Sequence, residues 1–358
     1  MSGVEAVLAP EREAPPVGRF EFLPGWAFYT PVVAYWIALG VRYGDWSLPT
    51  IANPTIEQGG LCGESKTSIL DQVTGTARNW LARYVCVAGP DLADAEAARQ
   101  RAGIDYPLVA KPDIGCNGTG VRLVADRAAL ADYLAEFPRD AAVVLQEYVR
   151  HPCEAGLFYI RYPGEKRGRV TSVTLKQEPN VCGDGRSTVQ QLVLADPRLN
   201  AIRHFFIPRL GARLAEVPGR GQTVSLLFVG NHCKGSTFRD GRDEITDALA
   251  ARIDEVAQAT PEFHFGRFDV RYDSLAALRR GEGFSIIEIN GVGSEATHVW
   301  DPTARLLPSW RDQFFHYRAA FEIGRVNRAR GFRTRGSFAM LHAWRRQRRL
   351  MASYPQHD

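Results

Sequence analysis

The stretch from Phe284 to Glu295 most constrains this chain, because it joins a strand pattern to side chains with ligand chemistry. Its isoleucines are β-branched, which suits a packed, pleated surface. Residues i and i+2 of a strand point to the same face, so the carboxylate of Glu288 and the amide of Asn290 project together. Two oxygen donors at a strand end suit Mg²⁺, which takes oxygen ligands and usually shares them with phosphate groups. The stretch therefore predicts a buried strand that ends in a cation site.

A second carboxylate, Asp269, lies upstream in another segment with a strand pattern, residues 266–271. Arg267 shares its face. We expect Asp269, Glu288 and Asn290 to hold a metal ion while Arg267 reaches a phosphate. The alternative is a pair of amphipathic strands with solvated polar faces, and these two segments alone do not decide between the two.

A glycine-rich segment at residues 115–120 lies between two predicted strands, and the first of these carries Lys111. Gly115, Gly118 and Gly120 allow backbone amides to approach phosphate oxygens. The spacing matches neither of the common phosphate-binding glycine motifs, both of which precede a helix. The segment is typical of a flap between two strands.

An earlier glycine cluster, Gly59, Gly60 and Gly63, permits tight turns before a short helix that we expect Ser65 to cap. Lys66 then falls in the first turn, where a cation opposes the positive end of the helix dipole. An anion bound nearby would explain that position. An ordinary surface lysine is the alternative.

The rest of the chain mixes short strands with helices. We predict further strands at residues 48–54, 83–88, 106–111, 142–149, 157–162, 170–176 and 223–229. Helices are predicted from near residue 31 to 41, and over 94–102, 128–137, 188–194, 199–214, 245–259, 310–325 and 338–351. A loose leader over residues 1–20 and polar loops over 231–237 and 276–283 complete the prediction.

The composition suits a globular protein of two or three domains, with 358 residues of which 45% are hydrophobic. A net charge of +4 gives no reason to expect a nucleic-acid partner. The six cysteines are scattered without a C-x-x-C pair, which predicts neither a zinc site nor a disulfide framework and favours a reduced, cytosolic compartment. Residues 1–18 lack the basic and apolar regions of a signal peptide.

Two segments raise the question of a membrane surface. Residues 26–41 are apolar and aromatic but too short to span a bilayer, so a buried helix is favoured over one that lies on a membrane. The nine arginines between Arg325 and Arg349 have no acid among them. Together these segments predict contact with an anionic membrane. The alternative is a tail that packs on the rest of the protein, its arginines paired or solvated.

Taken in order, the motifs resemble those of the ATP-grasp superfamily, and within it the D-alanine–D-alanine ligase-like carboxylate–amine ligases. The matching segments, within about residues 84–302, are Val109-Ala-Lys-Pro112, Gly115–Gly120, Gln146-Glu-Tyr-Val149 with Glu154, Lys176, Arg267-Phe-Asp269 and Glu288-Ile-Asn290. The turn at residues 181–188 also resembles one found in some of these ligases. The resemblance implies an α+β ATP-grasp fold in which two α+β subdomains enclose ATP. It divides the chain into an atypical N-terminal region (1–83), a flap subdomain (84–185), a metal-strand subdomain (186–324) and a basic helical C-terminal tail (325–358).

The resemblance also implies a role for each matching residue. ATP contacts are implied for Lys111, Gly115, Asn117, Gly118, Thr119, Glu147, Tyr148, Val149, Glu154 and Lys66. Within that set, Lys111 contacts the α- and β-phosphates, the backbone at Tyr148 and Val149 holds adenine, and Glu154 holds the ribose. Mg²⁺ binds to Asp269, Glu288 and Asn290, and the catalytic cations are Arg267 and Lys176.

Two departures from the family fall where the second substrate should bind. Residues 1–83 lack the alternating strand–helix pattern of the usual N-terminal domain, and no proline follows Asn290. Dipeptide-ligase specificity is therefore not implied. The side chains predicted to line the acceptor site are Ser294, Glu295, Thr297 and His298.

The function implied is ATP- and Mg²⁺-dependent joining of a small-molecule carboxylate to an amine through an acyl phosphate. A kinase that transfers the phosphoryl group without ligation is one alternative. A non-catalytic nucleotide-binding module is another, disfavoured because Arg267 and the three metal positions are present. We expect a cytoplasmic protein without a nucleic-acid partner. A homodimer and peripheral contact with the inner face of the membrane are left open.

Overall fold

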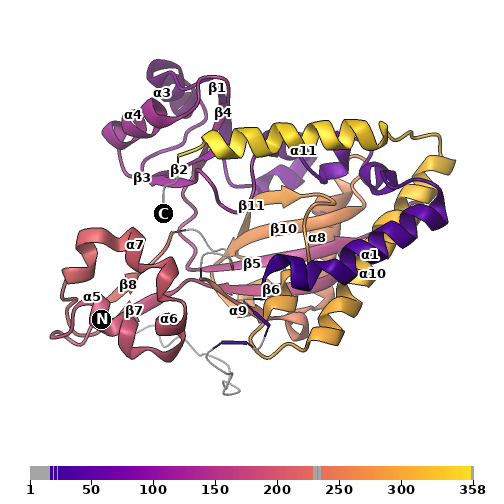
Figure 1. The fold of residues 1–358 in the computed structure, drawn as a ribbon. Coiled ribbons are helices and arrows are strands. Elements are labelled where there is room, and N and C mark those ends of the chain that lie inside the picture. Colours follow the sequence, from indigo (N-terminus) through magenta and orange to yellow (C-terminus); the bar gives the residue numbers. More distant parts are fainter. Residues whose placement is uncertain (1–16, 19, 22, 229–231, 233–234, 356–358) are drawn as a thin grey trace.

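The computed structural model describes residues 17–355 except 19, 22, 229–231, 233 and 234 (Figure 1). The described residues leave out most of the predicted leader over residues 1–20. They also leave out residues 231, 233 and 234 of the predicted loop over 231–237. The fold is α+β, as predicted, and two antiparallel sheets of unequal size organise it.

The described strands and helices follow the chain in mixed order. The strands are β1 (Tyr84–Ala88), β2 (Leu108–Pro112), β3 (Arg122–Val124), β4 (Ala142–Glu147), β5 (Cys153–Ile160), β6 (Arg169–Gln177), β7 (Asn180–Cys182), β8 (Thr223–Ser225), β9 (Thr237–Asp240), β10 (Phe265–Tyr272) and β11 (Phe284–Asn290). The helices are α1 (Gly25–Tyr43), α2 (Lys66–Leu70), α3 (Leu92–Arg101), α4 (Arg127–Glu136), α5 (Val189–Ala195), α6 (Pro197–Ala201), α7 (Ile207–Leu210), α8 (Asp247–Gln258), α9 (Leu275–Arg279), α10 (Leu306–Ala329) and α11 (Gly336–Ser353).

The smaller sheet has the strand order β1-β4-β2-β3, and α3 and α4 pack on it. Its core holds Leu108, Leu130 and Val143, all fully buried. Tyr354, which directly follows α11, packs into the same core. The C-terminus therefore stabilises a subdomain that begins more than 200 residues earlier in the chain.

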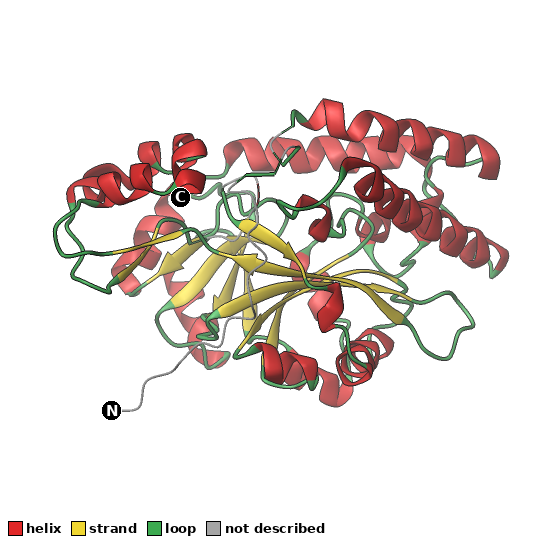
Figure 2. Ribbon diagram, turned by 90° about the horizontal axis from the view of Figure 1, so that it is seen from below, coloured by secondary structure: helices red, strands yellow, loops and turns green. Residues whose placement is uncertain are grey.

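The larger sheet has the strand order β11-β10-β5-β6-β9, and Figure 2 shows helices on both of its faces. α8 packs on one face through Leu249 and Ile253. α10 packs on the other face through Ala320 and Ile323, and α1 lies against α10. Burial on both faces explains why β10 and β11 are rich in apolar residues.

The sheets divide the chain differently from the predicted domains. A boundary at residue 185 would leave β5 and β6 with the smaller sheet, whereas they pair with β10 and β9 in the larger one. β7 and β8 form a separate two-stranded sheet, which packs with α5 to α7 into a small helical lobe. The order of strands along the chain does not show which sheet β5 and β6 join, because the strands of both sheets are antiparallel and apolar.

Helix α1 begins at Gly25, before the predicted start near Pro31, and that proline lies inside the helix. A proline at this position removes one backbone hydrogen bond. The first turn, N-terminal to the proline, packs against the rest of the protein, with the ring centroid of Phe28 4.3 Å from that of Trp300. Among the described residues, no helix has an apolar stretch long enough to cross a bilayer.

Four other local predictions were wrong. The segment predicted as a strand at 48–54 contains a buried 3₁₀ turn, Leu48–Ile51, because Pro49 fixes the turn and Leu48 packs under α10. The predicted helix over 199–214 is broken near Pro208 and Gly211. The predicted strand over 223–229 ends at Ser225. The predicted loop over 276–283 contains most of α9, which Ser274 caps.

Candidate active site

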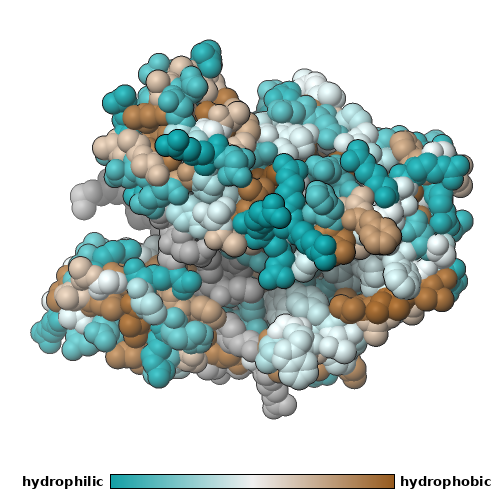
Figure 3. Space-filling model, turned by 45° about the horizontal axis from the view of Figure 1, so that its top comes forward, coloured by the Kyte–Doolittle hydropathy of each residue, from teal (hydrophilic) through white to brown (hydrophobic). Residues whose placement is uncertain are grey.

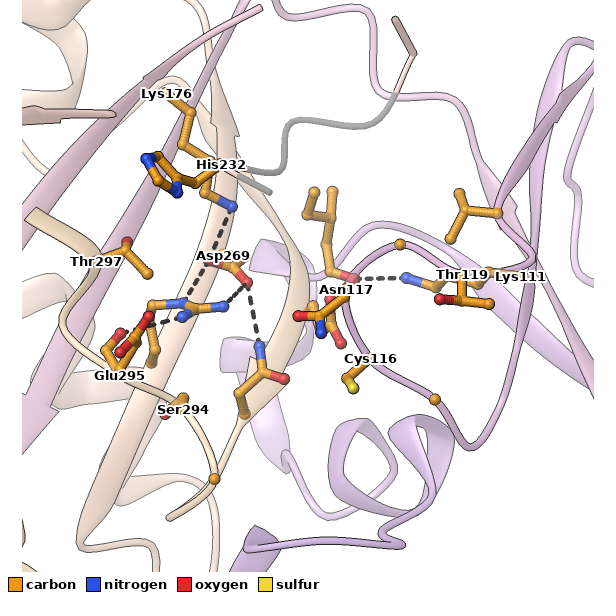
Figure 4. Close-up of a pocket in the computed structure, with 18 of the residues that line it drawn as sticks. Lys111, Cys116, Asn117, Thr119, Lys176, His232, Asp269, Ser294, Glu295 and Thr297 are labelled. Carbon is orange, nitrogen blue, oxygen red and sulfur yellow. Dashed lines mark hydrogen bonds and ion pairs between the residues drawn. The ribbon is translucent and has the colours of Figure 1, made fainter. Parts of the chain in front are cut away.

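A cavity of about 960 Å³ lies where the two sheets, the helical lobe and α11 meet. β2 and the glycine loop line it on one side, β10 and β11 on the other (Figure 4). Cavities of this size are typical of ligand sites. Of the predicted site residues, only His298 does not line it.

Asp269 is the centre of the polar network on β10 and β11 (Figure 4). Arg267 donates to both of its oxygens, at 2.8 and 2.9 Å. Lys176 Nζ donates to Oδ1 at 3.3 Å, and Asn290 Nδ2 donates to Oδ2 at 3.1 Å. The strand register explains the cluster, because Asp269 lies opposite Glu288 and Arg267 lies opposite Asn290.

Buried charges around Asp269 hold one another in the ionised state. Burial by itself would raise the pKa of the Asp269 carboxyl, but Arg267 and Lys176 outweigh it and hold that pKa at about 2. Burial would lower the pKa of Lys176, yet Asp269 and Glu154 raise it above its ordinary value. The site therefore presents two permanent cations, Arg267 and Lys176, beside the Asp269 carboxylate at neutral pH.

The predicted metal ligands meet the chemical requirements of Mg²⁺. Asp269 and Glu288 are cross-strand partners and Asn290 bonds to Asp269, so two carboxylates and one amide lie together. These are hard oxygen donors, which Mg²⁺ prefers. The described residues contain no group of three or more histidine, cysteine, aspartate or glutamate side chains placed to hold a metal ion.

Lys111 and Lys66 approach from the opposite side of the cavity. Lys111 on β2 is buried and donates to Gln146 Oε1 at 2.8 Å and to the carbonyl of Ile287 at 3.1 Å. Burial lowers its pKa. Lys66 donates to the carbonyl of Gly115 in the glycine loop and lies 3.6 Å from Glu288. Ser65 caps α2, as predicted, so Lys66 occupies the first turn.

The glycine loop has a left-handed backbone at three of its residues. Gly118 and Gly120 have φ values of 67° and 72°, and Asn117 has 57°. A Cβ at Gly120 would lie 2.9 Å from the ring of Pro112. The loop therefore turns tightly over the cavity, with Asn117 and Thr119 lining it.

The residues expected to hold adenine and ribose lie at the cavity's edge. Tyr148 and Val149 directly follow β4 and line it. The Glu147 carboxylate is engaged with Arg83, whose Nε lies 2.7 Å away. The Glu154 carboxylate accepts from Lys176 at 2.6 Å, so this residue joins the ion network around Asp269.

The predicted acceptor residues divide into two groups. Ser294, Glu295 and Thr297 line the cavity, whereas His298 is buried outside it, with Nε2 2.9 Å from Asp312 Oδ2. The prediction for His298 was therefore wrong, because the 3₁₀ turn at 297–300 points successive side chains in different directions. The Glu295 carboxylate accepts hydrogen bonds from three side chains: Tyr29, Trp300 and Gln313.

Several residues that line the cavity were not predicted, and they come from the N-terminal and C-terminal parts of the chain. Glu64, Tyr29, Trp344 and Gln347 all line the cavity. One oxygen of Glu64, Oε2, is buried and has no hydrogen-bond partner among the described residues, and burial raises the pKa of this carboxyl. Its position two residues before Lys66 was the only signal. α11 offered none, because its pattern shows a surface helix.

A close backbone contact brings the N-terminal region to the end of β11. The amide of Val292 donates to the carbonyl of Gly59 at 3.0 Å, and that of Gly293 to the carbonyl of Gly60 at 2.6 Å. A Cβ at Gly291 would lie 2.3 Å from the carbonyl of Gly59. Only glycine fits there, so these residues hold Glu64 and Lys66 beside β11.

Comparison with known proteins returns ligases. The glutathione biosynthesis bifunctional protein of Enterococcus faecalis is 27% identical over 161 residues, which are 39% of this chain and 20% of that protein. Among solved structures, the bifunctional glutathione synthetase from Pasteurella multocida has a TM-score of 0.37 and 18% identity, over 69% of this chain and 36% of that one. No protein-family profile matches the chain.

Two further solved structures are similar to the chain. The D-Ala:D-Ser ligase from Enterococcus faecalis has a TM-score of 0.41 and 15% identity, over 74% of this chain and 64% of that one. The D-alanine–D-alanine ligase from Bacillus anthracis has a TM-score of 0.41 and 12% identity, over 82% and 72%. By their names, these similar proteins are glutathione-synthesis enzymes and ligases that act on D-alanine. The chain spans about a fifth of the curated relative and about a third of the glutathione synthetase.

Proposed function

We propose that this chain is an ATP-grasp ligase, which uses ATP to join a carboxylate to an amine through an acyl phosphate. The observation that carries the proposal is the buried network of Arg267, Lys176 and Asp269, faced by Glu288 and Asn290 across the register of β10 and β11. Two fixed cations beside oxygen ligands suit a phosphoryl group in transfer.

In the first step, an oxygen of the substrate carboxylate attacks the γ-phosphorus of ATP, and ADP leaves. Arg267 and Lys176 stabilise the charge that develops on the transferred group, and neither needs to reorient, because Asp269 already fixes both. Lys111 and Lys66 neutralise the remaining phosphate charge from the side of the glycine loop. Asp269, Glu288 and Asn290 would hold Mg²⁺, which when bound neutralises phosphate oxygens.

In the second step, the nitrogen of the amine attacks the acyl carbon, phosphate leaves, and the amine loses a proton. Glu64 is suited to receive the amine, because its buried Oε2 has no hydrogen-bond partner among the described residues and an N–H of the neutral amine would supply one. Trp344 and Gln347 of α11 bound this end of the cavity. We thus assign the amine site to residues from the N-terminal and C-terminal parts of the chain. This assignment agrees with the atypical N-terminal region, where the sequence departs from the family pattern.

The competing functions differ in which products they release. The test incubates the protein with ATP, Mg²⁺ and a panel of carboxylic acids, with and without hydroxylamine, and measures ADP and hydroxamate. A ligase releases ADP and forms hydroxamate, because hydroxylamine traps the acyl phosphate. A kinase releases ADP and leaves a stable phosphorylated product instead, and a binding module releases no ADP. Glu288→Gln is the inactive control.

The cytoplasmic location and the homodimer stay predictions. Analytical ultracentrifugation of the purified chain tests the dimer directly. A single species at the mass of one chain, 39.8 kDa, over the micromolar range would contradict it.

A further inference from the structure

The outward face of α1 carries a row of large apolar side chains. Trp26, Val33, Ile37 and Val41 have exposed fractions of 77%, 55%, 49% and 69%. Their spacing of seven, four and four residues places them on one side of the helix. Arg42 is the single charged residue of α1. Exposed apolar rows of this length mark interaction surfaces.

The opposite face of α1 is firmly packed, so the exposed row has a fixed position. Phe28, Val32 and Leu39 are buried. Trp36 packs edge-on against Tyr317 and Phe321 of α10, with ring centroids 5.3 and 5.1 Å apart. The helix lies on the protein and cannot turn its row inward.

Helix α11 adds a cluster of positive charge. Arg345, Arg346, Arg348 and Arg349 are all exposed, and within the described chain none of them forms an ion pair with an acid. Arg348 lies over the ring of Trp344, 4.9 Å from its centroid. Other arginines of the tail are engaged elsewhere: Arg330 pairs with Glu262, and Arg328 donates to the carbonyl of Tyr43. Of the nine arginines of the predicted tail, these four lie together near the end of α11 and form this cationic cluster.

The two features lie on one side of the molecule. α1, α10 and α11 gather on the same side of the larger sheet in Figures 1 and 2. Figure 3 looks toward that side and shows hydrophilic side chains over α11 above a hydrophobic row over α1. Phe338, in the first turn of the same helix, adds an apolar side chain that is 90% exposed.

We propose that this surface, the apolar row of α1 with the four arginines of α11, docks the protein on an anionic lipid bilayer. The arginines match the charge of anionic headgroups. The apolar row suits the boundary between headgroups and acyl chains, where helices lie in the plane of the membrane. Neither helix spans the bilayer, which agrees with the lack of a spanning stretch among the described helices.

Other occupants match only part of this surface. A nucleic acid or an acidic protein would pair with the arginines but leave the charge-free row of α1 without a partner. A second copy of the chain in a two-fold contact would cover the row but bring two sets of arginines together. Docking would also place the cavity beside the headgroups, because Tyr29 of α1 and Trp344 of α11 line it. This last consequence rests on the proposed function, whereas the docking itself does not.

The test is co-sedimentation of the full-length protein with vesicles of phosphatidylcholine alone or with about 30% phosphatidylserine. We expect binding to the anionic vesicles only, weakened by salt. Replacing the four arginines, Arg345, Arg346, Arg348 and Arg349, by glutamine should reduce the partition coefficient by about several hundredfold, since each basic residue contributes about fivefold. Val33→Ser with Ile37→Ser should reduce it by a similar factor.

Matched variants control for charge and hydrophobicity. Glutamine at four other exposed arginines removes the same charge elsewhere: Arg139, Arg167, Arg186 and Arg220. Leu194→Ser with Val217→Ser removes exposed apolar side chains from the helical lobe. Both controls should bind vesicles like the original chain, and circular dichroism checks that every variant is folded.

Three results would overturn the proposal. The first is a full-length protein that stays in the supernatant with anionic vesicles at low salt. The second is binding that the control variants weaken as much as the test variants do. The third is a dimer in light scattering that Val33→Ser with Ile37→Ser dissociates, since a second copy would then cover the row. None of these measurements needs ATP, so failure here leaves the proposed ligase function standing.

Discussion

Asp269 has a structural role in addition to the ligand role predicted for it. Its carboxylate neutralises two buried cations, Arg267 and Lys176. Glu288 differs, because its side chain is about a quarter exposed and its ion pair with Lys66 has a length of 3.6 Å. The two predicted metal ligands should therefore respond differently to loss of charge.

Glu288→Gln should abolish turnover and leave the fold intact. Loss of a Mg²⁺ ligand worth several kcal/mol reduces kcat by at least about 100-fold. Asp269→Asn should have the same effect on kcat and also lower the free energy of unfolding by about 3–5 kcal/mol, since two buried cations lose their partner. ADP release at saturating Mg²⁺ and urea unfolding measure the two effects. Full activity of the Glu288 variant would remove this residue from the metal site.

Glu64 should make stability depend on pH. Burial raises its folded-state pKa above the ordinary value of 4.5, so the folded state favours the protonated form. Its stabilising contribution is fully present below pH 4.5 and is lost as the pH rises through the folded-state pKa. Glu64→Gln should therefore match the original chain near pH 4 and become more stable than it as the pH rises. Urea unfolding of the nucleotide-free protein at a series of pH values measures this difference.

The exposed neighbour Glu57 provides the control for Glu64. Glu57→Gln should show a smaller pH-dependent gain than Glu64→Gln. A constant difference between the Glu64 variant and the original chain across the whole pH range would contradict the assignment.

At the scale of elements, α11 connects the N-terminal region to the smaller sheet. Its Gln347 accepts from the amide of Gly63, and the Tyr354 hydroxyl donates to the carbonyl of Ile114 at 2.7 Å, just before the glycine loop. The Tyr354 ring stacks on Phe137 of the smaller sheet's core. The C-terminal helix therefore fixes the base of the loop that we expect to cover ATP.

Removing the Tyr354 ring should loosen that loop. Tyr354→Ala should cost about 3–5 kcal/mol of stability through the cavity it leaves, and Tyr354→Phe about 1 kcal/mol through one lost hydrogen bond. Hydrogen exchange of residues 112–120 should quicken clearly in the alanine variant and little in the phenylalanine variant. Equal protection in both variants would mean that the loop holds its position without α11.

The glycine loop itself should respond to a Cβ at Gly118. Gly118→Val strains a backbone with φ of 67° and blocks the approach of phosphate, so the KM for ATP should rise about tenfold or more. Gly164→Val is the matched control, because Gly164 has φ of 94°, open space around it and a position away from the cavity lining. Both variants should lose stability. If the KM for ATP changes equally in both, the loop does not contact ATP.

At the scale of the whole molecule, the larger sheet depends on segments from both ends of the chain. Asn327, near the end of α10, donates to the carbonyls of Ile51 and Ala52. Gly324 packs against the carbonyl of Leu48, where a Cβ would lie 2.4 Å away. The predicted tail boundary at residue 325 therefore cuts through α10, which continues to Ala329.

Two truncations should separate the end of α10 from α11. A chain that ends after Gly324 loses Asn327 and should aggregate, whereas one that ends after Arg335 keeps α10 whole and should stay folded with weaker ATP binding. Size-exclusion chromatography and circular dichroism compare the two. A monodisperse, folded product from the shorter chain would show that the contacts of Asn327 are dispensable.

The sequence by itself determined the parts of the site that follow from local geometry. The period of two along a strand placed Arg267 with Asp269 and Glu288 with Asn290, and the structure brings both pairs together. Ser65 as a helix cap and the left-handed turns of the glycine loop also follow from a few neighbouring residues. The α+β class could be predicted for the same reason, since it needs only the alternation of such elements.

Only the tertiary structure decided which distant surfaces meet. That Glu64 and Trp344 share a cavity depends on Gly60 packing against Gly291 and on α11 crossing between the sheets, and neither contact leaves a periodic signal. His298 was misplaced because the turn that orients it is set by packing around Asp312. Such contacts arise from close packing of segments far apart in sequence, whose complementary shapes exist only after the chain has folded.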